Sequence, residues 1–179
     1  EKILEYYDFI EEYQKNRRTA KEVFPSENTI AIEKNKLTEM QWGMKYEFSK
    51  KLIINARIET VMEKKLFKKA IIARRIILPA SGYYEWEKRE KLSIKRKIEL
   101  NSKSIMSLAG IYNIIRIGDE WVRAFVVLTK PADPSIRAIH SRMPVIIPKD
   151  MEKKWLYGEA SDTIINELID ISNYDFKIL

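Results

Sequence analysis

The sequence predicts an α+β fold, built on a mostly antiparallel sheet or a partly closed β-barrel with short helices at its flanks. Seven or eight short segments have the apolar or alternating pattern of strands. Helical patterns occur among them at intervals, without the regular alternation of strand and helix that builds parallel sheets. The chain has 179 residues, and neither a linker nor an internal repeat divides it, so we expect one domain over residues 1–179.

In the first half of the chain, apolar residues at near-helical spacing predict an amphipathic helix over residues 1–17. Short strands are expected at 29–33 and at 40–44. A second helical pattern runs over 61–73, and a buried strand follows at 76–78.

In the second half, strands are expected at 83–86, 92–100, 105–112 and 121–128, with a hairpin turn at Gly118 and Asp119 between the last two. A Pro-rich break from Pro131 begins a short helix that reaches Ile139, and a buried strand follows at 145–147. Two closing helices, 150–157 and 161–169, begin at the N-cap candidates Asp150 and Ser161, before an edge strand at 174–179.

The composition limits the possible chemistry. The net charge of +7 suits an anionic partner such as nucleic acid, although many basic proteins bind none. The chain has no cysteine, so disulfides, thiolate metal sites and a thiol nucleophile are excluded within these residues. With one histidine, a histidine-based metal site is not expected either. We expect no cofactor, no membrane span and no secretory signal, and therefore a cytoplasmic protein.

The stretch 78–88, LPASGYYEWEK, places a single carboxylate among large aromatic rings. A strand alternates its faces, so Tyr83 and Glu85 point one way while Tyr84 and Trp86 point the other. An apolar wall raises the pKa of a carboxyl group and makes Glu85 a candidate proton donor. A half-buried strand with one solvated acid explains the same residues equally well.

Three polar residues lie at breaks beside predicted strands, where active sites usually lie. They are Asn55 before a helix, Glu85 in the aromatic strand, and His140 before Arg-Met-Pro. An amide, an acid and an imidazole can supply an orienting hydrogen bond, a proton donor and a proton shuttle. Taken singly, His140 fits an ordinary surface or core histidine, and Asn55 fits a helix cap.

Several short strings in a fixed order distinguish this chain. They are Asn-Ala-Arg-x-Glu-Thr at 55–60, Pro-Ala-Ser-Gly-Tyr-Tyr-Glu-Trp at 79–86, Ala-Gly-Ile-Tyr at 109–112 and Ile-His-Ser-Arg-Met-Pro-Val-Ile at 139–146. Together with Phe24-Pro25 and Trp42-Gly43, they resemble the SRAP family of SOS-response-associated peptidases, which includes abasic-site DNA–protein crosslinking proteins. The similarity extends to about Trp155.

The resemblance implies a sensor of abasic sites in single-stranded DNA. In that family an N-terminal Cys, exposed when the initiator Met is removed, condenses through its thiol and α-amine with the sugar aldehyde to form a thiazolidine. Asn55 matches the residue that orients the Cys. Glu85 matches the acid that assists sugar-ring opening and Met removal, and His140 matches the imidazole that transfers protons during imine formation and reversal.

The same resemblance implies four DNA-binding residues. Arg57 and Arg142 match phosphate-binding positions, while Trp42 and Trp86 are candidates to stack on bases or wedge between them. Guanidinium groups pair with phosphates, and aromatic faces hold unstacked bases without demanding a sequence. The expected partner is single-stranded DNA with abasic sites, bound by a monomer that associates with the nucleoid during DNA damage.

One departure from the family is serious, because the chain has no Cys and the family's Met-Cys-Gly-Arg start lies upstream of Glu1. The favoured expectation is that the native protein has this segment and that the helix over residues 1–17 follows it. The alternative is a member that has lost the nucleophile and binds single-stranded DNA without crosslinking. A basic α+β protein with no nucleic-acid role is the third hypothesis.

Overall fold

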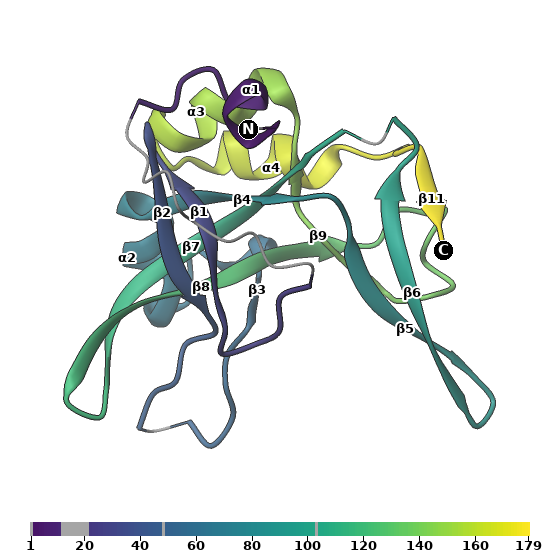
Figure 1. Ribbon diagram of the computed structural model, residues 1–179, viewed down its shortest axis with the longest axis horizontal. Helices are drawn as coiled ribbons and strands as arrows, with labels where there is room; N and C mark the ends of the chain where they lie inside the picture. Colours follow the sequence, from purple (N-terminus) through teal and green to yellow (C-terminus); the bar gives the residue numbers. More distant parts are fainter. Residues whose placement is uncertain (1, 12–21, 48, 103) are drawn as a thin grey trace.

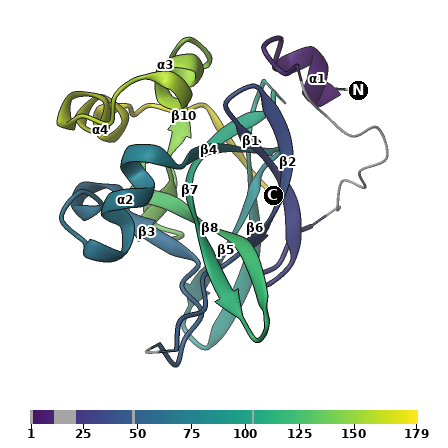
Figure 2. The same ribbon diagram turned by 90° about the vertical axis from the view of Figure 1, so that its left-hand side faces the viewer.

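A closed five-stranded β-barrel forms the centre of the protein. The computed structural model describes residues 2–11, 22–47, 49–102 and 104–179. The barrel strands are β1 (Asn28–Glu33), β2 (Lys36–Trp42), β4 (Arg75–Ala80), β7 (Met106–Ile117) and β8 (Glu120–Pro131). Their order is β7-β4-β1-β2-β8, and β8 pairs with β7 again to close the ring, which Figure 2 shows around a common axis. The β2–β8 pair is parallel and the other four are antiparallel, so the predicted α+β fold is confirmed.

Three short strands extend this sheet, and a second sheet lies beside it. Strand β3 (Asn55–Arg57) pairs with β8 in parallel, β9 (Arg142–Pro144) pairs with β8, and β10 (Ile146–Ile147) pairs with β7. The second, antiparallel sheet has the order β11-β6-β5, with β5 at Tyr83–Arg89, β6 at Leu92–Leu100 and β11 at Phe176–Ile178. It lies to the right of the barrel in Figure 1.

The helices are short and lie outside the barrel. They are α1 (Lys2–Tyr6), α2 (Lys65–Ala73), α3 (Glu152–Tyr157) and α4 (Asp162–Asp170), with 3-10 turns η1 (Ile58–Thr60) and η2 (Lys149–Met151). Figure 1 shows α1, α3 and α4 together above the strands. Within the described ranges, no helix is long and apolar enough to cross a membrane.

Alternation along the strands produces two hydrophobic clusters on opposite faces. Ile77 belongs to the cluster that includes Trp155 of α3 and Leu168 of α4. Its neighbour Ile76 belongs to the cluster that includes Tyr83 and Ile98 of the second sheet. Because successive strand residues point to opposite faces, the same strands hold the helices on one side and the second sheet on the other.

Most predicted strands are confirmed, including the strand over 92–100 and the C-terminal edge strand. The predicted turn at Gly118 is also confirmed, with a φ of 61°. The first helix is wrong in length. It ends at Tyr6, because Tyr7 turns into the core with none of its surface exposed. Residues 12–17 of that prediction lie outside the described residues.

Three further helix predictions are corrected. The helix expected over 61–73 begins at Lys65, because a 3-10 turn over 58–60 and a turn over 61–63 precede it. No helix leads to Ile139. There Asp133 accepts hydrogen bonds from the backbone N–H and hydroxyl of Ser135, a local arrangement that competes with helix formation. Asp150 lies inside η2 and does not cap it, whereas Ser161 accepts the N–H of Ile164 as predicted.

Candidate functional site

A cleft with a volume of about 1030 Å³ is lined by strands of both sheets. A volume of this order is typical of sites that enclose a ligand. All seven residues that the sequence singled out line it, from four different strands and the loop before β9: Trp42, Asn55, Arg57, Glu85, Trp86, His140 and Arg142. The fold therefore brings together residues that lie up to a hundred positions apart in the chain.

Glu85 and His140 form the titratable pair of this cleft. The Nδ1 atom of His140 lies 3.8 Å from Oε1 of Glu85, and the two side chains are 47% and 23% exposed, respectively. Burial raises the pKa of the Glu85 carboxyl, and a charge on His140 opposes that rise. A carboxyl group with a raised pKa beside an imidazole is suited to donate and recover a proton.

The backbone of Arg142 gives the imidazole a partner in either protonation state. Its N–H lies 3.1 Å from Nδ1 of His140, and its carbonyl oxygen lies 3.0 Å from the same nitrogen. A neutral Nδ1 accepts the N–H, while a protonated Nδ1 donates to the carbonyl oxygen. The ring can therefore take up and release a proton without losing its hydrogen bond to the backbone.

A sharp turn directs β5 across the cleft. Pro79 and Ala80 complete β4, so the turn consists of Ser81 and Gly82 alone. A Cβ atom at Gly82 would lie 2.7 Å from the backbone oxygen of Ile98, which is closer than any side chain tolerates. Glycine is required here because the backbone of β6 approaches so closely.

The predicted alternation of β5 is confirmed. Glu85 reaches His140 on one face. On the other face, the ammonium group of Lys95 lies 4.1 Å from the ring centre of Tyr84 and 5.8 Å from that of Trp86.

Asn55 is the first residue of β3, and it is exposed. It therefore begins a strand that continues the barrel and does not cap a helix. Its side-chain amide has no hydrogen-bond partner in the part of the chain that the structure describes, so both its donor and its acceptor are available to a ligand. The indole N–H of Trp42 donates to the backbone oxygen of Ile54, the preceding residue, at 3.0 Å, which fixes the ring beside Asn55.

The two predicted phosphate-binding arginines differ. Arg57 is exposed, and the described residues give its guanidinium no hydrogen bond or ion pair. Arg142 instead binds Glu59 through both of its terminal nitrogens, at 2.5 and 2.8 Å, and donates to the backbone oxygen of Thr129 at 2.7 Å. These bonds hold the pKa of Glu59 below its usual range. A phosphate on Arg142 would have to compete with Glu59.

The sequence reasoning missed a second group in the cleft. Phe24, Tyr84 and Trp86 surround the ammonium group of Lys95, with Phe24 at 5.7 Å, and we call these three rings the aromatic platform. Phe24 and Trp86 are each 48% exposed, so their faces are accessible. Lys95 lies opposite Trp86 across the two-residue turn at Glu90 and Lys91, and neither of these is a residue type that marks a tight hairpin turn in a sequence.

The N-terminal segment also reaches the cleft. Lys2 and Ile3 line it, and the N–H of Tyr7 donates to the backbone oxygen of Ile3 at 2.9 Å. The hydroxyl of Tyr7 lies 2.8 Å from that of Ser107, which in turn donates to Glu152 at 2.5 Å inside the core. A buried hydrogen-bond network therefore holds the helical turn that lines the cleft. No group of three or more His, Asp or Glu side chains in the described ranges is placed to hold a metal ion.

Comparisons with known proteins identify the family and the fold. The family described as SOS response associated peptidase (SRAP) matches residues 1–177. Abasic site processing protein YoaM of Bacillus subtilis is 32% identical over 167 residues, which cover 86% of this chain and 73% of that protein. Abasic site processing protein YoqW of the same species is 34% identical over 152 residues, covering 78% and 67%.

A crystal structure of a protein from Bordetella bronchiseptica has the same fold. Its TM-score is 0.83 over 99% of this chain and 92% of that one, at 22% sequence identity. The chain belongs to the SRAP family.

Proposed function

We propose that this protein recognises abasic sites in single-stranded DNA and processes them in the cleft between its two sheets. One observation carries the proposal: Glu85 and His140 lie 3.8 Å apart in a cleft. Its other walls present accessible aromatic rings, together with an amide and a guanidinium group that have no hydrogen-bond partner among the described residues. The relatives YoaM and YoqW are named abasic site processing proteins. An abasic sugar in its open form is an aldehyde, and acid–base catalysis is what its formation and capture require.

Each polar residue then has a defined task. Glu85 in its protonated form donates to the ring oxygen of the sugar, the bond between C1 and that oxygen breaks, and the C1 hydroxyl releases its proton to solvent to give the aldehyde. An amine attacks the aldehyde carbon to give a carbinolamine. His140 then donates a proton to the carbinolamine hydroxyl, which leaves as water, and an imine forms. The amide of Asn55 orients the amine. Adding the water back through His140 reverses the reaction.

A stable product requires a thiol, which the 179 residues do not contain. We propose that it belongs to a Cys on the N-terminal side of Lys2, exposed by removal of an initiator Met with the help of Glu85. Addition of the thiol to the imine carbon, with transfer of its proton to nitrogen, closes a thiazolidine. The position of Lys2 and Ile3 in the wall of the cleft supports this proposal, because a residue that precedes them can enter the cleft that also contains the acid–base pair.

The DNA strand is held by charge and stacking. Arg57 binds phosphate, while Trp42 and the aromatic platform hold unstacked bases. Arg142 binds a second phosphate when its ion pair with Glu59 opens. Such contacts demand no particular sequence, which suits a protein that acts wherever a base has been lost. We propose that the protein acts as a monomer.

The test is a crosslinking reaction with full-length protein. It is incubated with a single-stranded oligonucleotide carrying one abasic site, and with the undamaged strand, before denaturing electrophoresis. We expect a shifted band with the abasic strand alone, and a much slower reaction for Glu85→Gln. The matched control is Glu90→Gln, an exposed acid at the tip of the same hairpin, which should react at the native rate. A native protein that yields no shifted band refutes the proposal.

A second function is favoured by the lack of cysteine together with the aromatic platform. In this alternative the protein binds single-stranded DNA without bonding to it covalently. Its affinity would fall steeply with salt and would be the same for abasic and undamaged strands. Equal affinities, with no covalent product from full-length protein, would select this alternative.

A further inference from the structure

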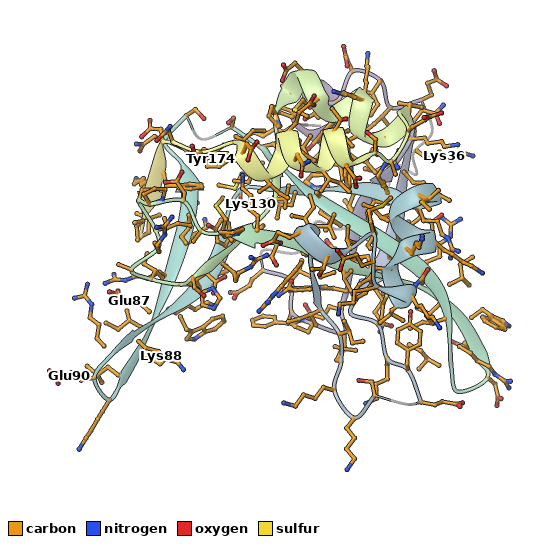
Figure 3. The ribbon with its side chains drawn as sticks, turned by 180° about the vertical axis from the view of Figure 1, so that it is seen from behind. Lys36, Glu87, Lys88, Glu90, Lys130 and Tyr174 are labelled. Atoms are coloured by element: carbon orange, nitrogen blue, oxygen red, sulfur yellow. The ribbon has the colours of Figure 1, made fainter. Side chains whose placement is uncertain are left out.

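A buried lysine at the end of β8 binds the C-terminal part of the chain. Lys130 is 2% exposed. Its ammonium group donates to the backbone oxygens of Leu168 at 2.9 Å and Ile171 at 2.5 Å, and to the hydroxyl of Tyr174 at 3.2 Å. Burial lowers its pKa to about 8, so at neutral pH all three N–H groups are present and all three are used. Figure 3 shows Lys130 and Tyr174 near each other where the second sheet meets the rest of the molecule.

Asp133, three residues further on, joins the same segment to the loop that carries His140. One of its oxygens accepts the N–H of Asn173 at 2.7 Å and that of Tyr174 at 3.3 Å. The other accepts the N–H and the hydroxyl of Ser135, at 3.0 and 2.6 Å. Asp133 is 5% exposed, and its full set of partners explains why a buried carboxylate is tolerated here.

The C-terminal segment then reaches the strand that carries Glu85. The rings of Tyr174 and Phe176 are stacked with their centres 5.2 Å apart, and Phe176 meets Tyr83 edge to face at 6.5 Å. Tyr83 lies on the same face of β5 as Glu85. Phe176 also begins β11, which pairs with β6.

The second sheet is attached to the barrel by its chain connections and by side-chain packing. Among the described strands, neither β5 nor β6 pairs with a strand of the larger sheet. The hairpin is joined to the barrel by the turn at Ser81 and Gly82 and by the connection over 101–105. Tyr83 and Ile98 of the second sheet pack with Ile76 of the barrel in one hydrophobic cluster, and the C-terminal segment adds the rings of Tyr174 and Phe176 to this contact.

We propose that residues 171–179 form a C-terminal clasp, fastened by Lys130 and Asp133, that sets the distance between Glu85 and His140. Asp133 fixes the loop that ends at His140, and the stacked rings fix the strand that carries Glu85. Both positions therefore depend on one segment. Lys130, Asp133 and Phe176 are positioning residues. The effect of the clasp on the distance between Glu85 and His140 does not depend on the proposed function, whereas its effect on activity rests on that function.

Two variants test the clasp. Lys130→Met removes the ammonium group and keeps an unbranched side chain. Phe176→Ala removes the ring link to Tyr83 at a half-buried position near the end of the chain, and it carries the same test if Lys130→Met fails to fold. The matched control is Lys88→Met, an exposed lysine on β5 that points away from the clasp.

The first readout is independent of activity. His140 is the single histidine, so its ring resonances report directly on the surroundings of the pair. We expect them to shift in both test variants, with faster amide exchange in β6, and to remain unchanged in Lys88→Met. Folded test variants whose His140 resonances and β6 exchange match the native protein would overturn the proposal, because a residue that only stabilises the fold leaves the native geometry intact.

The second readout is the rate of abasic-site processing by full-length protein. We expect it to fall at least about tenfold in both test variants, because misplacement of a reacting group by about 1 Å can cost two orders of magnitude. Affinity for single-stranded DNA should stay within about threefold of the native value, since Arg57 and the aromatic platform are intact. If native protein does not process abasic DNA, the proposed function fails, whereas shifted His140 resonances would still support the clasp.

Discussion

Replacing Glu59 by Gln should lower the stability of the protein and strengthen its binding to DNA. Glu59 accepts two hydrogen bonds from Arg142, at 2.5 and 2.8 Å, and the two side chains are 31% and 20% exposed. Hydrogen bonds to charged groups contribute about 1.5–3 kcal/mol each. A glutamine keeps one acceptor, and the pair is partly solvated, so we expect a loss of about 1–2 kcal/mol in the free energy of unfolding.

The pH dependence tests the cause of that loss. Arg142 holds the pKa of Glu59 below its usual range, so the folded state binds this proton less tightly than the unfolded state does. The stabilisation by Glu59 is therefore complete above the unfolded pKa of about 4.3 and disappears as the pH falls through the lower folded pKa. Urea denaturation at pH 7 should show the full difference between Glu59→Gln and the native protein, and denaturation near pH 3 should show a smaller one.

The DNA measurement tests the role of Arg142. Released from Glu59, its guanidinium can bind one more phosphate, so the slope of log affinity against log salt should steepen by up to about 0.7 for a single strand. Glu63→Gln is the matched control, an exposed acid four residues away that should change neither quantity. If Glu59→Gln is less stable but its salt slope is unchanged, Arg142 positions the His140 loop and does not contact the DNA backbone.

Three further predictions concern the framework of the site. Burial lowers the pKa of Lys130 to about 8, so between that value and its unfolded pKa the unfolded state binds more protons, and stability rises with pH. Relative to Lys130→Met, the free energy of unfolding should increase by about 2 kcal/mol from pH 7 to pH 9.5, measured by urea denaturation. Tyr7→Phe removes the hydrogen bond to Ser107 and should cost about 1 kcal/mol, with faster amide exchange in residues 2–7. Gly82→Ala should destabilise by more than about 1 kcal/mol in thermal unfolding, because its Cβ would meet the backbone oxygen of Ile98.

Each of these has a result that would contradict it. For Lys130, the contradicting result is that the difference in the free energy of unfolding between the native protein and Lys130→Met stays constant from pH 7 to pH 9.5. For Tyr7, it is native exchange at residues 2–7 in the Phe variant, which would mean that packing alone anchors the segment. An alanine at position 82 that leaves the melting temperature unchanged would show that β5 and β6 can separate at little cost.

How far the sequence predicted this protein depended on the range of the interactions. The strands were predicted well, because alternating residues mark the half-exposed strands and continuous apolar runs mark the central strands, which are buried on both faces. Helices were less predictable. Asp133 formed a local turn where a helix was expected, and Tyr7 ended the first helix by turning its ring into the core. In both places, side-chain contacts outweighed helix propensity.

The site shows the same division. The sequence by itself determined which residue types are present, namely an acid among aromatic rings, a single histidine, an asparagine before a predicted helix, and a net positive charge without a thiol. Only the tertiary structure decided that Arg142 is bound to Glu59, that Lys95 lies over the aromatic platform, and that Lys130 and Asp133 fasten the C-terminal clasp. These contacts join residues far apart in the chain, and no local pattern of spacing specifies them. They depend on which strands become neighbours when the barrel closes.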